Sequence, residues 1–118
     1  MPVTWIEHKG IKILYSDFSG LKKNEDLFIV LEDAVKNFTA AEGKVRHILN
    51  FTGASMTKEF MAKAKELGKQ LPLNKTEKDA YVGIDGLKKV LLQAYLMITG
   101  EPANTFDTVE QALDWIIK

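Results

Sequence analysis

The start of the chain alternates apolar and polar residues in the way that is typical of extended strands. In "IKILYS", residues 11–16, every second side chain from the first is apolar, and Leu14 adds an apolar side chain on the opposite face. We therefore expect a strand that is covered in part on both faces. A β-rich run at 3–7 precedes it, and the intervening Lys9-Gly10 suits a tight turn because glycine accepts a positive φ. The sequence thus predicts an N-terminal β-hairpin.

Four later stretches repeat apolar residues at intervals of three or four, which is the spacing of an amphipathic helix. The first begins at Asn24 and the second follows Thr57, and both of these residues are good N-caps. Gly100 suits the end of the third helix, because helices commonly end on a left-handed residue. Thr108 and Gln111 form a capping box at the start of the fourth. The predicted helices cover residues 25–42, 58–68, 86–99 and 109–116.

Three β-rich runs complete the pattern and predict strands at 45–51, 80–84 and 103–106. The run at 80–84 is apolar throughout, which indicates a strand inside the sheet, whereas "PLNKTEKD", residues 72–79, predicts a polar loop. Strands that alternate with amphipathic helices imply a mostly parallel sheet with right-handed crossovers. We expect a single α/β domain over residues 1–118, with a four- to five-stranded mixed sheet, the hairpin and about four helices.

The composition narrows the classes of function. Lys and Arg together number 16, as do Asp and Glu, and this net charge of zero argues against nucleic acid as a partner. The lack of Cys excludes disulfides, thiolate nucleophiles and zinc–thiolate sites. No stretch has the length of a signal peptide's apolar core or of a membrane span, and the longest candidate, 90–98, contains Gln93. We therefore expect a cytoplasmic protein without a membrane span.

No catalytic, cofactor-binding or metal-binding constellation is visible. His8 and His47 are the only histidines, and neither has carboxylates at a metal-ligand spacing. His47 lies within an apolar run and indicates a hydrogen-bonded histidine of the core or of a sheet edge. No serine lies in a GxSxG elbow, and "GIDG" at 83–86 matches neither nucleotide-binding loop pattern. We expect no catalytic site, no cofactor and no metal.

Two lysines at the start of the third predicted helix leave two interpretations open. Asp85 can cap the helix and offset the lysine charges, so that the segment is only a helix start. Alternatively, Lys88 and Lys89 join the free N–H groups of the helix start in contacting an anion or an acidic partner. Both lysines lie away from the centre of the expected buried stripe, so both heads should reach solvent. That stripe comprises Leu87, Val90, Leu91, Ala94 and Ile98.

The residues Tyr95, Leu96 and Met97 give the clearest sequence indication of an interface. Consecutive residues of a helix point in different directions, so these three apolar side chains cannot all face one sheet. Part of this surface should therefore meet another helix, a second subunit or a ligand.

Three separated segments resemble the bacterial STAS-like family, which is related in fold to the anti-sigma-factor antagonist AA of stage II sporulation. They are "WIEHKGIKILYSDFSGL" at 5–21, "VGIDGLKKVLLQAYLMITG" at 82–100 and "FDTVEQALDWI" at 106–116. The resemblance covers nearly the whole chain and implies a mixed sheet packed on helices. Relatives of this fold bind a partner protein after a central strand, where phosphorylation of a serine at a helix N-terminus releases the partner. A further fold neighbour, the CRAL-TRIO lipid-transfer group, encloses apolar ligands.

The segment that corresponds to this phosphorylated helix start is "NFTGASMTKEF", residues 50–60, and it lacks the Asp-Ser pair of the antagonists. Ser55 and Thr57 are the candidate phosphoacceptors that remain. A phosphate on either would gain from free N–H groups and the helix dipole, with Lys58 as a countercharge. The alternative is that Thr57 serves only as an N-cap.

These observations predict a non-catalytic STAS-like domain that acts through a protein partner or as a homodimer. The competing hypothesis is a carrier of a small apolar, lipid-like ligand, which should retain that ligand through purification. An enzyme ranks third because no catalytic constellation is visible.

Overall fold

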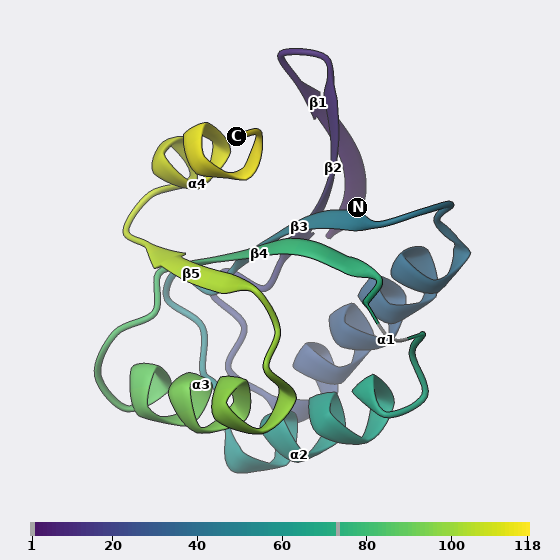
Figure 1. The fold of residues 1–118 in the computed structure, drawn as a ribbon. Helices are drawn as coiled ribbons and strands as arrows, with labels where there is room; N and C mark the ends of the chain where they lie inside the picture. The colour runs from purple at the N-terminus through teal and green to yellow at the C-terminus, as the bar shows by residue number, and fades with distance from the viewer. Residues whose placement is uncertain (1, 73) are drawn as a thin grey trace.

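A computed structural model describes residues 2–72 and 74–118, which fold around one mixed five-stranded sheet (Figure 1). The strands follow the order of the chain across the sheet: β1 (Val3–His8), β2 (Ile11–Asp17), β3 (Val45–Asn50), β4 (Thr76–Val82) and β5 (Ala103–Phe106). β1 and β2 are antiparallel, and each later pair of neighbours is parallel. The structure confirms the predicted α/β fold with its N-terminal hairpin.

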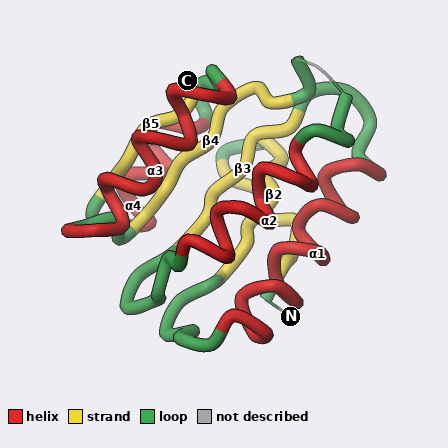
Figure 2. Tube along the Cα trace, turned by 90° about the horizontal axis from the view of Figure 1, so that it is seen from below, coloured by secondary structure: helices red, strands yellow, loops and turns green. Residues whose placement is uncertain are grey.

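Three helices cover one face of the sheet and a fourth covers the other. The crossovers α1 (Asn24–Ala40), α2 (Lys58–Gly68) and α3 (Gly86–Thr99) lie below the sheet in Figure 1, while α4 (Val109–Ile116) lies above it. Successive crossovers of one hand that advance in the same direction across a sheet place their helices on the same face. Figure 2 shows α1 and α2 side by side on this face.

The pleat of the sheet separates two apolar cores. Leu14 of β2 faces α1, α2 and α3, whereas its neighbour Ile13 packs with Ala112 and Ile116 of α4. On the three-helix side, a ring cluster fills the space near the carboxyl ends of the strands; its centre is the stacked pair Phe18–Phe51, with ring centroids 4.5 Å apart. Both faces of β2 are therefore covered, as the sequence predicted.

Several predicted boundaries were wrong, since α1 ends at Ala40 rather than at residue 42 and β4 ends at Val82 rather than at residue 84. Asn24 is the first residue of α1 rather than its N-cap, and its Oδ1 accepts a hydrogen bond from the Thr57 hydroxyl at 2.5 Å. β4 begins at Thr76, so the end of the predicted polar loop is strand, because β3 and β5 supply backbone partners on both sides. Met1, and residue 73 of that predicted loop, lie outside the described residues.

α3 turns a different stripe toward the core from the one predicted. Leu92 is 2% exposed, whereas Leu87 is 71% and Ile98 is 65% exposed. The predicted stripe was therefore wrong except at the half-buried Leu91, because Val90 and Ala94 are exposed as well. Because apolar residues surround most of α3, its sequence has no sharply defined apolar face, and anchoring contacts decide its orientation.

Lys88 supplies one of these anchors. Its Nζ donates to the backbone oxygens of Phe51 at 3.1 Å and Gly83 at 2.8 Å, and lies 3.6 Å from Asp85 Oδ1. The Lys88 side chain is 15% exposed, so the prediction that both lysine heads reach solvent was wrong for Lys88, while Lys89 is exposed. Lys88 thus joins the ends of β3 and β4 to the first turn of α3.

Local signals determined several helix ends and turns correctly. Thr57 is the N-cap of α2, Thr108 and Gln111 form the capping box of α4, and Gly100 ends α3 with φ of 66°. Gly83 has φ of 76°, and a Cβ there would lie 2.6 Å from the Thr52 Cα.

Within the described ranges, every helix is too short or too polar to span a membrane.

Candidate ligand-binding pocket

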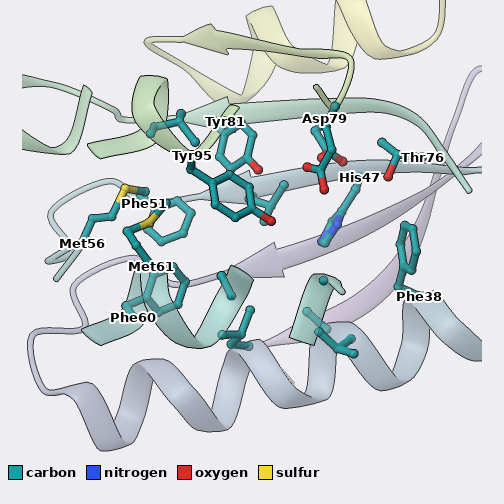
Figure 3. A pocket seen from close by; sticks show the side chains of 18 of the residues that line it. Phe38, His47, Phe51, Met56, Phe60, Met61, Thr76, Asp79, Tyr81 and Tyr95 are labelled. Carbon is teal, nitrogen blue, oxygen red and sulfur yellow. The ribbon is translucent and has the colours of Figure 1, made fainter. Parts of the chain in front are cut away.

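An apolar cavity of about 90 Å³ lies between the sheet and the three helices α1, α2 and α3 (Figure 3). Most of its lining consists of aliphatic, aromatic and methionine side chains. These include Leu31, Ala34, Phe38, Phe51, Met56, Phe60, Met61, Ala64, Leu92 and Tyr95. A wider groove of 570 Å³ shares part of this lining, including Phe38, Leu71 and Glu101. The cavity therefore has a neighbouring open surface through which a small molecule can approach.

The register of the sheet gathers polar groups at one end of this cavity. His47 of β3 is the register partner of Asp79 of β4, and Asp79 in turn pairs with Ala103 of β5. Glu101 lies two residues before Ala103, in the connection from α3, and also lines the cavity. Figure 3 shows the hydroxyl of Tyr81 directed toward the same end as Asp79.

Asp79 is the most unusual of these groups because it is an acid at the centre of an apolar core. Its side chain is 5% exposed, and Oδ1 has no hydrogen-bond partner within residues 2–72 and 74–118. Burial raises the pKa of Asp79 well above its usual range, and the charge of Glu101 and a hydrogen bond with Glu101 raise it further. The two carboxyls therefore tend to retain a proton between them.

The same buried and acidic environment raises the pKa values of two neighbouring phenols, those of Tyr81 and Tyr95. Burial is the largest cause of the raised pKa of Tyr81, and the charges of Asp79 and Glu101 add to that shift. The pKa of Tyr95 is raised by burial and then by Glu101 and Asp79. Both phenols consequently stay protonated at physiological pH and can donate hydrogen bonds.

His47 is buried and neutral, which confirms the prediction of a hydrogen-bonded core histidine. Its side chain is 7% exposed, and its Nε2 lies 2.7 Å from Ser16 Oγ. Burial lowers the pKa of His47 to about 3. An imidazole with this pKa is a weak proton acceptor at neutral pH, so His47 is poorly suited to act as a general base.

The cavity and its polar end form an arrangement suited to binding a small molecule. The pocket has an apolar body and a few convergent polar groups at one end, which is the usual composition of a small-molecule site. The hydroxyl that contacts His47 belongs to Ser16, which is fully buried outside the cavity lining. Within the described part of the chain, the lining residues thus offer no serine beside a basic imidazole.

The three consecutive residues of the predicted interface have separate environments. Tyr95 lines the pocket, Leu96 packs partly buried against the three-helix core, and Met97 is 87% exposed. Only Met97 therefore belongs wholly to the surface. It continues an exposed apolar face of α3 that we call the α3 outer face; its members are Leu87, Val90, Met97 and Ile98.

The candidate phosphoacceptors lie at the start of α2. The Thr57 hydroxyl accepts from the Phe60 N–H at 3.0 Å and also contacts Asn24, so it is engaged as a cap. Ser55 is half-buried, and its N–H donates to the Leu21 oxygen at 2.9 Å. Phosphorylation of either residue stays a prediction.

Sequence reasoning missed the acid pair. Asp79 was placed in a polar loop, and Glu101 was not considered as a site residue. The usable signal was the position of Asp79 two residues before Tyr81, because alternate residues of a strand share a face. No comparable local signal identifies Glu101, since the pairing of β5 with β4 brings it to the pocket.

Comparisons with known proteins bear on the fold alone. Neither protein-family models nor curated proteins gave a match. Among solved structures, the chain is similar to an uncharacterized protein of the DUF3478 family with a SpoIIAA-like fold, from Shewanella loihica PV-4. The TM-score is 0.71 at 14% sequence identity, over 97% of this chain and 91% of that one. The chain therefore has the SpoIIAA-like, or STAS-like, fold that the sequence resemblance predicted.

Proposed function

We propose that this protein is a non-catalytic binding domain whose pocket holds a small, mainly apolar ligand. The observation that carries the proposal is the apolar cavity with its polar end, which includes an unpartnered oxygen of Asp79. A cavity of about 90 Å³ is smaller than the roughly 150 Å³ cavity that accepts benzene. The ligand is therefore a compact molecule, or one whose remainder lies in the adjoining groove.

Native mass spectrometry of freshly purified protein tests this proposal, because a carrier retains extra mass that unfolding releases. Ala64 lines the cavity and Ala62 is exposed on the same helix, so the two alanines provide a matched pair of variants. Ala64→Leu fills the cavity and should abolish the extra mass, whereas Ala62→Leu should retain it. Bare wild-type protein that also fails to bind added 1-butanol would contradict the proposal.

A second candidate function is self-association through the α3 outer face. Exposures of 61% for Val90 and 87% for Met97 support it, because monomers rarely expose contiguous large apolar side chains. After Lys89, α3 carries no charged residue through Thr99, so a second copy could pack there without burying a charge. A homodimer is therefore the occupant favoured by the chemistry of this face.

Sedimentation velocity over a concentration series tests this candidate. Val90→Ser with Met97→Ser should shift the distribution toward monomer, whereas Ile29→Ser, at an apolar side chain of α1 that is 64% exposed, should leave it unchanged. Wild-type protein that remains monomeric across the series would rule out this dimer.

A further inference from the structure

The polar end of the pocket contains acids without a basic partner. Among the described lining residues, the side chains that can carry a negative charge at neutral pH are Asp79 and Glu101, and none is a lysine or arginine. α1 and α2 contribute only uncharged side chains to the lining, and β3 contributes the neutral His47. α3 contributes Tyr95, and β4 adds Tyr81. The described lining of the cavity therefore supplies no cation to this acid pair.

Asp79 provides an independent indication of a ligand. It is 95% buried, since 5% of its surface is exposed, yet its Oδ1 has no partner in the described ranges. A buried acceptor without a donor is costly, whereas a charge-assisted hydrogen bond to it is among the stronger polar contacts in proteins. Figure 3 shows the Asp79 carboxyl at the cavity wall, where a bound donor can reach it.

From the neighbouring carboxyls of Asp79 and Glu101 at the end of an apolar cavity, we infer that the ligand is a small primary amine with an aliphatic body. This inference rests on the proposed function, because it names the ligand class of the same pocket. An ammonium group has three donors and no acceptor, so it can donate to both carboxyls at once. The rings of Tyr81 and Tyr95 add favourable contacts for a cation.

The cavity size and the lining determine the rest of the ligand. Because the cavity of about 90 Å³ is smaller than one that accepts benzene, a chain of about four carbons suits it. This chain lies along Leu31, Met61 and Leu92, which are uncharged. Butylamine is therefore a suitable probe.

Other head groups fit the acid pair less well. A carboxylate would add a further negative charge to an acid pair that already tends to retain a proton, and an alcohol has a single donor for two acceptor groups. Glu101 also lines the adjoining groove, which contains lysines, but none of these lysines lines the cavity around Asp79. The buried carboxyl of Asp79 therefore dominates the choice of head group. The groove lysines are Lys44, Lys65, Lys69 and Lys75.

Titrations followed by protein NMR can test the ligand class with three probes that share a four-carbon body: butylamine, 1-butanol and butyrate. We expect butylamine to bind most tightly. Asp79→Asn should weaken butylamine about ten- to a hundredfold, the value of one charge-assisted hydrogen bond, and should weaken 1-butanol less than about threefold. Asp114→Asn is the matched control, because it removes one negative charge from an exposed site on α4, and it should change neither affinity.

Different results would contradict the amine ligand and the ligand-binding pocket. If 1-butanol or butyrate binds as tightly as butylamine, or if Asp79→Asn leaves butylamine binding intact, the amine is wrong while the pocket stands. If none of the three probes binds the wild-type protein, both the amine and the pocket are wrong. Should Asp79→Asn fail to fold, Glu101→Gln at the half-buried partner acid should show the same selective loss of butylamine.

Discussion

Acidification should destabilise this protein through His47. Because the folded-state pKa is lowered to about 3 from 6.5, the folded protein keeps the imidazole neutral where the unfolded chain takes up a proton. The stability due to this group is thus fully present above pH 6.5 and is lost as the pH falls toward 3. One pKa unit corresponds to about 1.36 kcal/mol, so the two units from pH 6.5 to 4.5 remove about 2.7 kcal/mol.

Asp79 changes the stability with pH in the opposite direction, so its contribution must be removed before that of His47 is measured. Its folded-state pKa is raised above 3.8, so the stability that it contributes is present at low pH and is lost as the pH rises toward that folded value. The two groups therefore oppose each other in the same pH window. An Asp79→Asn background isolates the contribution of His47.

Urea unfolding from pH 7.5 to 4.5 measures this contribution directly. In the Asp79→Asn background, the free energy of unfolding should fall by about 2.7 kcal/mol more than in a triple variant that adds Ser16→Ala and His47→Leu. The two added changes remove both partners of the Ser16–His47 hydrogen bond, so no buried polar group is left unpaired. Equal pH dependence of the two proteins would refute a buried neutral His47.

Three further predictions concern residues at or near the connections from strands to helices. Lys88→Met should lower the free energy of unfolding in urea by about 1–3 kcal/mol because two carbonyls lose their donor, whereas Lys89→Met should change it by less than about 0.5 kcal/mol; equal effects would contradict the anchor. Gly83→Ala should cost about 2–4 kcal/mol in the same assay, since its Cβ would lie 2.6 Å from backbone at a positive φ, and a loss below about 1 kcal/mol would contradict this close approach. If phosphate regulates this domain, Ser55 or Thr57 should carry it in peptides covering 52–58 from cells grown under several conditions, and consistently unmodified peptides would leave Thr57 as an N-cap only.

Much of the fold follows from local sequence signals. Gly100 and the Thr108–Gln111 pair set helix ends through their own backbone geometry, which distant contacts hardly alter. The alternation in β2 likewise survives folding, because Ile13 and Leu14 face two different cores. These features depend on residues within a few positions of one another.

The candidate site depends instead on contacts that the sequence does not display. Asp79 becomes part of a strand because β3 and β5 pair with its backbone, and the same pairing brings Glu101 beside it. The orientation of α3 is set by the contacts of Lys88 with carbonyls at the ends of two strands. Neither the acid pair nor the α3 outer face can be read from periodicity alone.

Methyl NMR of the labelled protein tests the central claim most directly, because it places a bound ligand among particular side chains. In separate titrations with butylamine and 1-butanol, we predict shift changes concentrated on methyl groups of the pocket, such as Leu31, Met61 and Leu92. Ala64→Leu should suppress these changes and Ala62→Leu should not. Changes confined to Val90 and Met97 on the α3 outer face, or no changes at all, would contradict a ligand-binding pocket beneath the three helices.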